Sequence, residues 1–197
     1  MNLPTYIINL KHRTDRYEHM VTEMKKLPVS YEFIDAVSHE TSSIGCFQSH
    51  LKCIKLAKEN KFPYVLILED DVIFTDDVVN ILQKILKLNE SYLLEWDMLY
   101  LGANLQSPAI RINSSLIKLT GAYTTHAYMI HERFYDVILN LFQTFEIDVH
   151  YYNLMPEHNI FMCDPIVAYQ LPSYSDLQDG YRDYNDAIFN NYLKYKP

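Results

Sequence analysis

The stretch YVLILEDDVIF, residues 64–74, places three consecutive acids directly after five apolar residues. Burying one carboxylate is costly, and crowding like charges beside it raises that cost. Glu69, Asp70 and Asp71 therefore need a positive partner. Receiver domains that accept a phosphoryl group and metal-dependent sugar transferases both end a buried strand in this way. The rest of the chain has to distinguish these two classes.

The composition indicates one globular domain with no nucleic-acid partner. The 197 residues are 49% hydrophobic and 21% charged, as in a folded domain with a substantial core. A net charge of −8, without a basic stripe, disfavours a nucleic-acid or anionic-membrane surface. The four glycines exclude a Walker loop and a G-x-G-x-x-G fingerprint, so any nucleotide is held by other means.

The sequence predicts a cytoplasmic protein without a transmembrane segment. Its first residues hold a short apolar run before a charged stretch, and no later window approaches about 18 apolar residues. Cys46, Cys53 and Cys163 lack metal-ligand spacing and suit reduced thiols. A peripheral position at an inner membrane, or a host cytosol for a viral protein, are the alternative locations.

Hydrophobic periodicity predicts strands that alternate with helices. The expected strands are 5–10, 31–36, 64–68, 96–102, 115–119, 126–130 and one or two within 159–170, and the expected helices are 17–27, 47–60, 76–88 and 131–145. This order indicates an α/β fold with a mostly parallel sheet flanked by helices. Ligands of such sheets bind at the carboxyl ends of the strands, where Asn9 and the three acids lie.

The three acids divide by face if the strand continues through them. Side chains alternate along a strand, so Glu69 and Asp71 would point one way and Asp70 the other. Glu69 and Asp71 could then share a divalent cation such as Mg²⁺ or Mn²⁺, with Asp70 in support. The alternative is that the acids cap the helix beginning at Asp76 or lie in a solvated turn.

The receiver interpretation fails on position. The acids of a receiver end its first strand, whereas two strands and two helices precede residue 64 here. The next apolar strand, WDMLYLG (96–102), ends in Gly102, and Asp97 lies at its other end. A later lysine to pair with the acids is not evident. A bound cation with one or two arginines would let an acidic protein hold a nucleotide-sugar diphosphate instead.

Several separated pieces together resemble glycosyltransferase family 25, the lipooligosaccharide and procollagen galactosyltransferase type. They follow the order of the family and are YIINLKHRTDR (6–16), FIDAV (33–37), IGCFQSH (44–50), LILEDDVIF (66–74), WDMLYLG (96–102), TTHAYMI (124–130), Ile147-Asp148 and SDL (175–177). IGCFQSH, similar to the G-C-x-x-S-H signature, is the most specific short piece.

The resemblance implies a single GT-A-like domain over residues 1–197, with family-like pieces at about 5–177 and a variable tail at 178–197. It implies a metal-dependent, inverting transfer of galactose or glucose from a UDP-sugar to a hydroxyl of a glycan or protein, in lipopolysaccharide biosynthesis or collagen glycosylation. Mn²⁺ is the typical metal, with Mg²⁺ as the alternative. A catalytically silent module that binds UDP-sugar or glycan is the second hypothesis. YNDAIFNNYLKY (184–195) could be a docking helix in a homo-oligomer.

The resemblance also assigns roles to single residues. Asp148 is the candidate general base, which an inverting transfer needs to deprotonate the acceptor hydroxyl, with a turn carboxylate as the structural alternative. The expected donor contacts are Asn9, Arg13, Arg16, Ser49, His50 and Asp70, and the expected metal ligands are Glu69, Asp71 and Asp176.

Several of these roles have rivals. Arg13 is preferred to Arg16 for the diphosphate, and Ser49 and His50 are expected in the first turn of their helix, after Gly45. The reserves are Glu157 and Asp164 for the base, His150 and His158 for a late imidazole ligand, and Gln170 and Tyr174 for sugar contacts.

Overall fold

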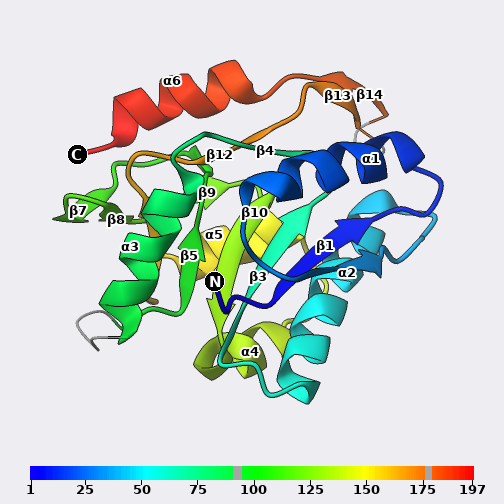
Figure 1. The fold of residues 1–197 in the computed structure, drawn as a ribbon, viewed down its shortest axis with the longest axis horizontal. Helices are drawn as coiled ribbons and strands as arrows, with labels where there is room; N and C mark the ends of the chain where they lie inside the picture. Colours follow the sequence, from blue (N-terminus) through cyan, green and yellow to red (C-terminus); the bar gives the residue numbers. More distant parts are fainter. Residues whose placement is uncertain (91–94, 176–178) are drawn as a thin grey trace.

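The computed structural model describes residues 1–90, 95–175 and 179–197, and its centre is an eight-stranded sheet (Figure 1). The strands of this sheet, in spatial order, are β2 (Tyr31–Asp35), β1 (Thr5–Asn9), β3 (Tyr64–Glu69), β10 (Ala127–His131), β5 (Met98–Tyr100), β11 (Ile160–Cys163), β8 (Leu116–Lys118) and β7 (Ile110–Asn113). Only β10 and β8 run against the other six, so the sheet is mixed and mostly parallel. The predicted fold class is confirmed.

Short strands and helices complete the chain. The short strands are β4 (Val72–Phe74), β6 (Asn104–Leu105), β9 (Ala122–Tyr123), β12 (Ala168–Gln170), β13 (Ser173–Ser175) and β14 (Gly180–Arg182). The helices are α1 (Thr14–Glu23), the 3-10 turn η1 (Met24–Lys26), α2 (Ser42–Glu59), α3 (Val78–Glu90), α4 (Glu132–Leu139), α5 (Ile147–Leu154) and α6 (Asn185–Tyr195). Among the helices in the described ranges, none combines the length and apolar character needed to span a bilayer.

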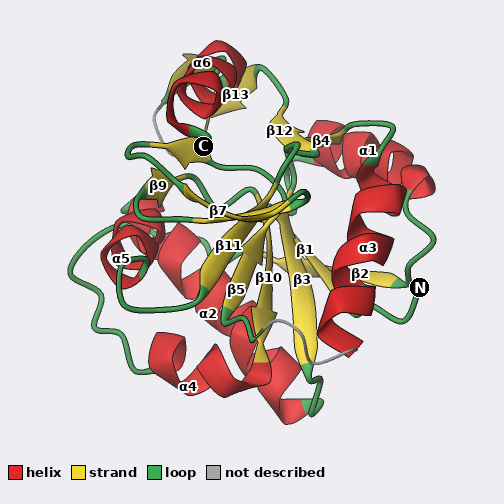
Figure 2. Cartoon of the chain, turned by 90° about the vertical axis from the view of Figure 1, so that its left-hand side faces the viewer, coloured by secondary structure: helices red, strands yellow, loops and turns green. Residues whose placement is uncertain are grey.

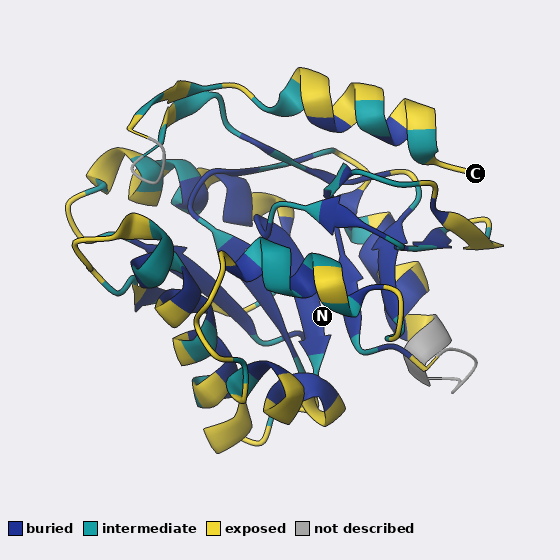
Figure 3. Ribbon diagram, turned by 180° about the vertical axis from the view of Figure 1, so that it is seen from behind, coloured by how far each residue is buried: buried dark blue, intermediate teal, exposed yellow. Residues whose placement is uncertain are grey.

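Both faces of the sheet are buried, which explains why its central strands are continuously apolar. Along β3, Val65 and Ile67 join the core beneath α2, α4 and α5, while Leu66 and Leu68 join the core beneath α1 and α3. Figure 2 shows these helices on the two sides of the sheet, and Figure 3 shows buried strands beneath helices with exposed outer faces.

Two predicted helix boundaries are wrong. The first helix residue of α2 is Ser42 rather than Phe47, so Gly45 lies inside the helix. The predicted helix 131–145 ends at Leu139, and a separate helix, α5, begins at Ile147. A Cβ on Gly45 would lie 2.5 Å from the Val37 carbonyl oxygen, so this glycine allows the loop after β2 to pack against α2.

The strand that carries the acids also ends sooner than the alternation argument requires. β3 stops at Glu69, Asp70 and Asp71 form a turn, and β4 resumes at Val72. The strict two-face division of the three acids is therefore wrong. β4 then pairs with β12, which passes close to the end of β5: a Cβ on Gly102 would lie 2.0 Å from the Ala168 carbonyl oxygen.

Candidate active site

Polar side chains from several elements meet where β1 and β3 end, which we call the carboxyl end of the sheet. The two strands are parallel neighbours, with Ile8 opposite Glu69. Asn9 at the end of β1 therefore lies beside the acid cluster, defined as Glu69, Asp70 and Asp71. This is the end of the sheet at which the sequence predicts a site.

Asp70 is held by two donors from the first 16 residues. Asn9 Nδ2 donates to Asp70 Oδ2 at 2.8 Å, and Arg16 Nη1 donates to Asp70 Oδ1 at 2.6 Å. Burial raises the pKa of Asp70, although Arg16 and Asn9 act in the opposite direction. Both oxygens of Asp70 are thus engaged within the protein, in line with the supporting role expected for this residue.

Arg16, rather than Arg13, contacts the acid cluster. Its Nη1 also lies 3.5 Å from Asp71 Oδ2, and its Nη2 donates to Ser173 Oγ at 2.8 Å and to the Tyr174 carbonyl oxygen at 2.9 Å. Arg13 pairs with the exposed Asp15 and donates to the same Tyr174 carbonyl at 3.2 Å. The fork of Arg16 therefore ties the acids to β13.

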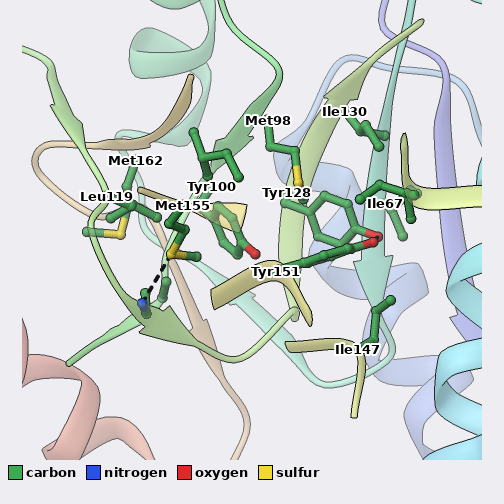
Figure 4. Close-up of a cluster of buried hydrophobic side chains, with 14 of the residues drawn as sticks. Ile67, Met98, Tyr100, Leu119, Tyr128, Ile130, Ile147, Tyr151, Met155 and Met162 are labelled. Carbon is green, nitrogen blue, oxygen red and sulfur yellow. Dashed lines mark hydrogen bonds between the residues drawn. The ribbon is translucent and has the colours of Figure 1, made fainter. Parts of the chain in front are cut away.

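Glu69 is held from the opposite side by buried groups. Thr125 Oγ1 donates to Glu69 Oε1 at 2.6 Å, and His50 Nε2 lies 3.4 Å from the same oxygen. His50 Nδ1 is 2.9 Å from Tyr128 Oη, which is 3.1 Å from Tyr151 Oη. Burial alone would raise the pKa of Glu69, but His50 and Thr125 lower it. Figure 4 shows Tyr128 and Tyr151 among the apolar side chains of this core.

Ser49 and His50 occupy the middle of α2 and not its first turn, because the helix begins at Ser42. Ser49 Oγ donates to the Gly45 carbonyl at 2.6 Å and accepts from the Val37 backbone N–H at 2.8 Å. Each residue is 1% exposed. The structure thus places His50 behind Glu69 and Ser49 in a local bond between α2 and the preceding loop.

Asp71 is the acid whose bonding is incomplete. Its Oδ1 is buried without a hydrogen-bond partner among the described residues, as is Oε1 of Gln170. Burial, with the charge of Glu69 adding to it, raises the pKa of Asp71 to about 7, against the lowering effect of Arg16. A buried, crowded carboxylate with a vacant acceptor site suits a divalent cation bound by carboxylates and substrate phosphates.

The described residues do not contain a complete cage for a metal. No group of three or more His, Cys, Asp or Glu side chains in residues 1–90, 95–175 and 179–197 could hold an ion. The expected third ligand, Asp176, lies outside the described residues. Glu69 and Asp71 therefore fit a cation that takes its remaining ligands from water, substrate or other residues.

Asp148 lies in the first turn of α5 and is linked to the acid cluster through adjacent threonines. The Thr124 backbone N–H donates to Asp148 Oδ2 at 3.3 Å, and the next residue, Thr125, binds Glu69. Burial raises the pKa of Asp148, and the charge of Glu69 acts in the same direction. Thr124 has a φ of 73°, which is unusual for a β-branched residue and is stored strain beside the cluster.

A cavity of about 280 Å³ adjoins Asn9. It is lined by Asn9, Lys11, Thr14, Tyr17, Phe33, Ile34 and Asp35. The Tyr17 and Phe33 rings have centroids 4.3 Å apart. A larger cavity of about 610 Å³ lies along α3 and Pro165, with none of the predicted site residues in its lining. The smaller cavity is the one lined by Asn9, which donates to Asp70 of the acid cluster.

Comparison with known proteins identifies the family. Residues 2–43 and 40–152 match the family described as "Glycosyltransferase family 25 (LPS biosynthesis protein)". The chain belongs to glycosyltransferase family 25. The predicted resemblance is confirmed.

Family 25 relatives include active and inactive proteins by name. Procollagen galactosyltransferase 1-A of Xenopus laevis is 28% identical over 171 residues, and the match covers 68% of this chain and 28% of that protein. The inactive glycosyltransferase 25 family member 3 of Homo sapiens is 26% identical over 157 residues, covering 64% of this chain and 26% of that protein. The chain thus spans just over a quarter of the length of these relatives.

A solved structure described as a glycosyltransferase involved in the glycosylation of the major capsid of PBCV-1 covers 99% of this chain and 90% of its own. Its sequence identity is 11% and its TM-score is 0.46.

Four of the reserve residues of this family 25 chain make their contacts elsewhere. His158 lies beside Asp97 at the other end of the sheet, with 3.8 Å between Nδ1 and Oδ2. Asp164 binds Arg111 and Tyr192. His150 packs against Phe47 and Phe145, and Glu157 is exposed in the turn after α5.

The roles of Thr124, Thr125 and Tyr128 were missed by sequence reasoning. All three lie in TTHAYMI, a piece that carries the family resemblance without assigning bonds to its residues. Their partners, Asp148, Glu69 and His50, are 24, 56 and 78 positions away in the chain. The family resemblance singled out residues 124–130, but only the fold shows which side chains these residues contact.

Proposed function

We propose that this family 25 chain is a metal-dependent, inverting glycosyltransferase that moves galactose or glucose from a UDP-sugar to a hydroxyl of a glycan or protein. The observation that carries the proposal is the vacant, buried Oδ1 of Asp71 beside Glu69 at the carboxyl end of the sheet. Two crowded acids at this place, one of them with an unpaired buried oxygen, favour a bound cation.

Glu69 and Asp71 would hold Mn²⁺ or Mg²⁺. When bound, the cation neutralises the charge that develops on the leaving diphosphate. The protein supplies the orientation: Thr125 and His50 fix Glu69, while Arg16 and Asn9 fix Asp70 and thereby the turn that carries Asp71. Pre-set carboxylates bind the ion without a further ordering cost.

The 280 Å³ cavity beside Asn9 suits the nucleoside of the donor. Its aromatic side chains, Tyr17 and Phe33, offer an apolar wall, and Asn9, Thr14 and Asp35 offer polar atoms. Arg13, one turn from Arg16, provides a positive charge near the same end of the sheet. Donor contacts by Ser49 and His50, which are both 1% exposed, would be indirect.

Asp148 would act as the general base. The acceptor oxygen forms a bond to the anomeric carbon as the bond from that carbon to UDP breaks, UDP leaves with the electron pair, and the hydroxyl proton passes to Asp148. The raised pKa of Asp148 makes it a stronger base than an exposed aspartate. The Thr124 N–H orients its carboxylate.

The names of the relatives support part of the substrate assignment. The name procollagen galactosyltransferase supports galactose as the sugar and a protein hydroxyl as the acceptor. The family description, which mentions LPS biosynthesis, supports a glycan of lipopolysaccharide as the acceptor. Relatives named inactive favour the second candidate, a silent module that binds UDP-sugar or glycan. The cytoplasm remains our proposed location, and a homo-oligomer formed through α6 remains a proposal.

Donor hydrolysis tests the proposal. The chain incubated with UDP-galactose or UDP-glucose and Mn²⁺ should release UDP, and chelation of the metal should stop the release. Asp71→Asn should lower the rate at least about 100-fold, because it removes a charged ligand. Asp76→Asn, an exposed acid five positions further on, is the matched control and should leave the rate unchanged.

A panel of UDP-sugars then separates the two candidates. Tight binding of a UDP-sugar without UDP release under Mn²⁺ or Mg²⁺ would favour the silent module. Absence of both binding and release for all UDP-hexoses and UDP-N-acetyl sugars would overturn the donor assignment.

A further inference from the structure

Gln170 lies beside Asp71 although it is 99 positions further along the chain. β12 pairs antiparallel with β4, with Gln170 opposite Val72, and the Leu171 N–H donates to the Asp71 carbonyl oxygen at 2.6 Å. Gly102 lets β12 pass this close to the end of the sheet. The backbone thus fixes Gln170 beside Asp71, and Gln170 is only 9% exposed.

The Gln170 amide shares one feature with the Asp71 carboxylate beside it. Oε1 is buried without a hydrogen-bond partner among the described residues, as is Oδ1 of Asp71. Two neighbouring side chains therefore each present a buried oxygen that lacks a donor.

We propose that Gln170 Oε1 is a ligand of the divalent cation, next to Asp71 and Glu69. The inference rests on the proposed function, since it adds a neutral oxygen to the same site. Leaving a buried acceptor unpaired is unfavourable, so two such oxygens on neighbouring side chains indicate a missing positive partner. Side-chain amide oxygens are hard ligands that suit Mn²⁺ and Mg²⁺.

An amide ligand would add an oxygen to the site without adding charge. Glu69 and Asp71 supply two negative charges, and the Gln170 amide oxygen would be a third, neutral ligand. A third carboxylate here would raise the repulsion that already raises the pKa of Asp71. The site would thus hold the ion while keeping positions open for the diphosphate of the donor.

Direct metal binding tests the assignment without relying on activity. Mn²⁺ would be titrated into the metal-stripped chain, with and without UDP, and free Mn²⁺ followed by electron paramagnetic resonance. Gln170→Met keeps the length of the side chain and removes the oxygen, and it should weaken Mn²⁺ binding by about 10-fold or more. Gln143→Met, in the exposed loop after α4, is the matched control and should bind as the wild type does.

Gln170→Glu provides a second test that does not depend on the Met variant folding. It replaces the neutral oxygen by a charged one and should tighten Mn²⁺ binding. Mn²⁺ should also raise the unfolding temperature of the wild type and of Gln143→Met more than that of Gln170→Met, a difference that a purely structural glutamine would not produce.

The outcomes separate this inference from the function on which it rests. Mn²⁺ binding that is lost in Asp71→Asn but unchanged in Gln170→Met, or not tightened in Gln170→Glu, would overturn the role of Gln170 alone. Absence of Mn²⁺ binding by the wild-type chain, with or without UDP, would overturn both.

Discussion

Two aspartates at opposite ends of the sheet, both with little exposed side chain, differ in how they are bonded. Asp97 precedes β5, and its side chain is 15% exposed; Asp71 follows β3 and is 12% exposed. Both oxygens of Asp97 accept short bonds, from Arg133 Nε at 2.9 Å and from the Asn159 N–H at 2.8 Å. Oδ1 of Asp71 has no such donor among the described residues. A satisfied buried carboxylate stabilises the fold, whereas an unsatisfied one leaves room for a ligand.

The largest expected effect tests whether the carboxyl end is catalytic. Asp148→Asn keeps the shape of the side chain but cannot accept the acceptor proton, so glycosyl transfer should fall by roughly 10²–10⁴-fold. UDP-sugar affinity should be unchanged, because Asp148 is assigned to the acceptor. Transfer would be followed with the best donor of the panel and binding by calorimetry. An equal loss of donor affinity would place Asp148 in the donor site instead.

The next effect concerns the arginine that bridges the acids. Arg16→Gln removes the only charge partner that the structure gives to both Asp70 and Asp71 within the described residues, and it should lower the free energy of unfolding by about 3 kcal/mol. Arg13→Gln, which removes a pair with the exposed Asp15 and a bond to the Tyr174 carbonyl, should cost less. Urea unfolding of both metal-free variants measures the difference, and equal costs would contradict it.

Isosteric substitution at the two aspartates should have effects of opposite sign. Asp97→Asn turns an NH₂ group toward a donor and should destabilise the metal-free protein by about 2 kcal/mol. Asp71→Asn relieves a buried charge, so stability at about pH 8 should be unchanged or higher. If Asp71→Asn destabilises the protein as much as Asp97→Asn does, the proposed difference in bonding between the two aspartates is wrong.

The smallest effect, taken per pH unit, is a dependence of stability on pH. The pKa of Asp71 is raised from 3.8 to about 7 in the folded state, so its proton stabilises the folded form below the lower value, and this contribution is lost as pH rises through the higher one. The metal-free wild type should lose stability across this window relative to Asp71→Asn, by at most about 1.4 kcal/mol per pH unit. Parallel curves for the two proteins would contradict the raised pKa.

Much of the fold could be predicted because the cues are local. The α/β order follows from local patterns: the apolar run 64–68, the strand near 96–102 and the apolar periodicity of α2 and α3. This order in turn places the candidate site at the carboxyl end of the sheet. The boundaries failed where tertiary contacts decide. α2 extends back to Ser42, and within its added turn Gly45 lies against the Val37 carbonyl, a contact that no helical pattern encodes.

The sequence by itself determined the family, a mostly parallel sheet and the place of Glu69, Asp70 and Asp71 at a strand end, because these follow from periodicity and ordered motifs. Only the tertiary structure decided that Asp70 is paired by Asn9 and Arg16, that Glu69 is held by Thr125, and that Asp71 is left with a vacant oxygen. Such pairing depends on distances between side chains tens of residues apart in the sequence. The hydrogen-bond partners, and not the presence of three acids, distinguish Asp70, whose oxygens are both bonded, from Asp71, which has an unpaired oxygen.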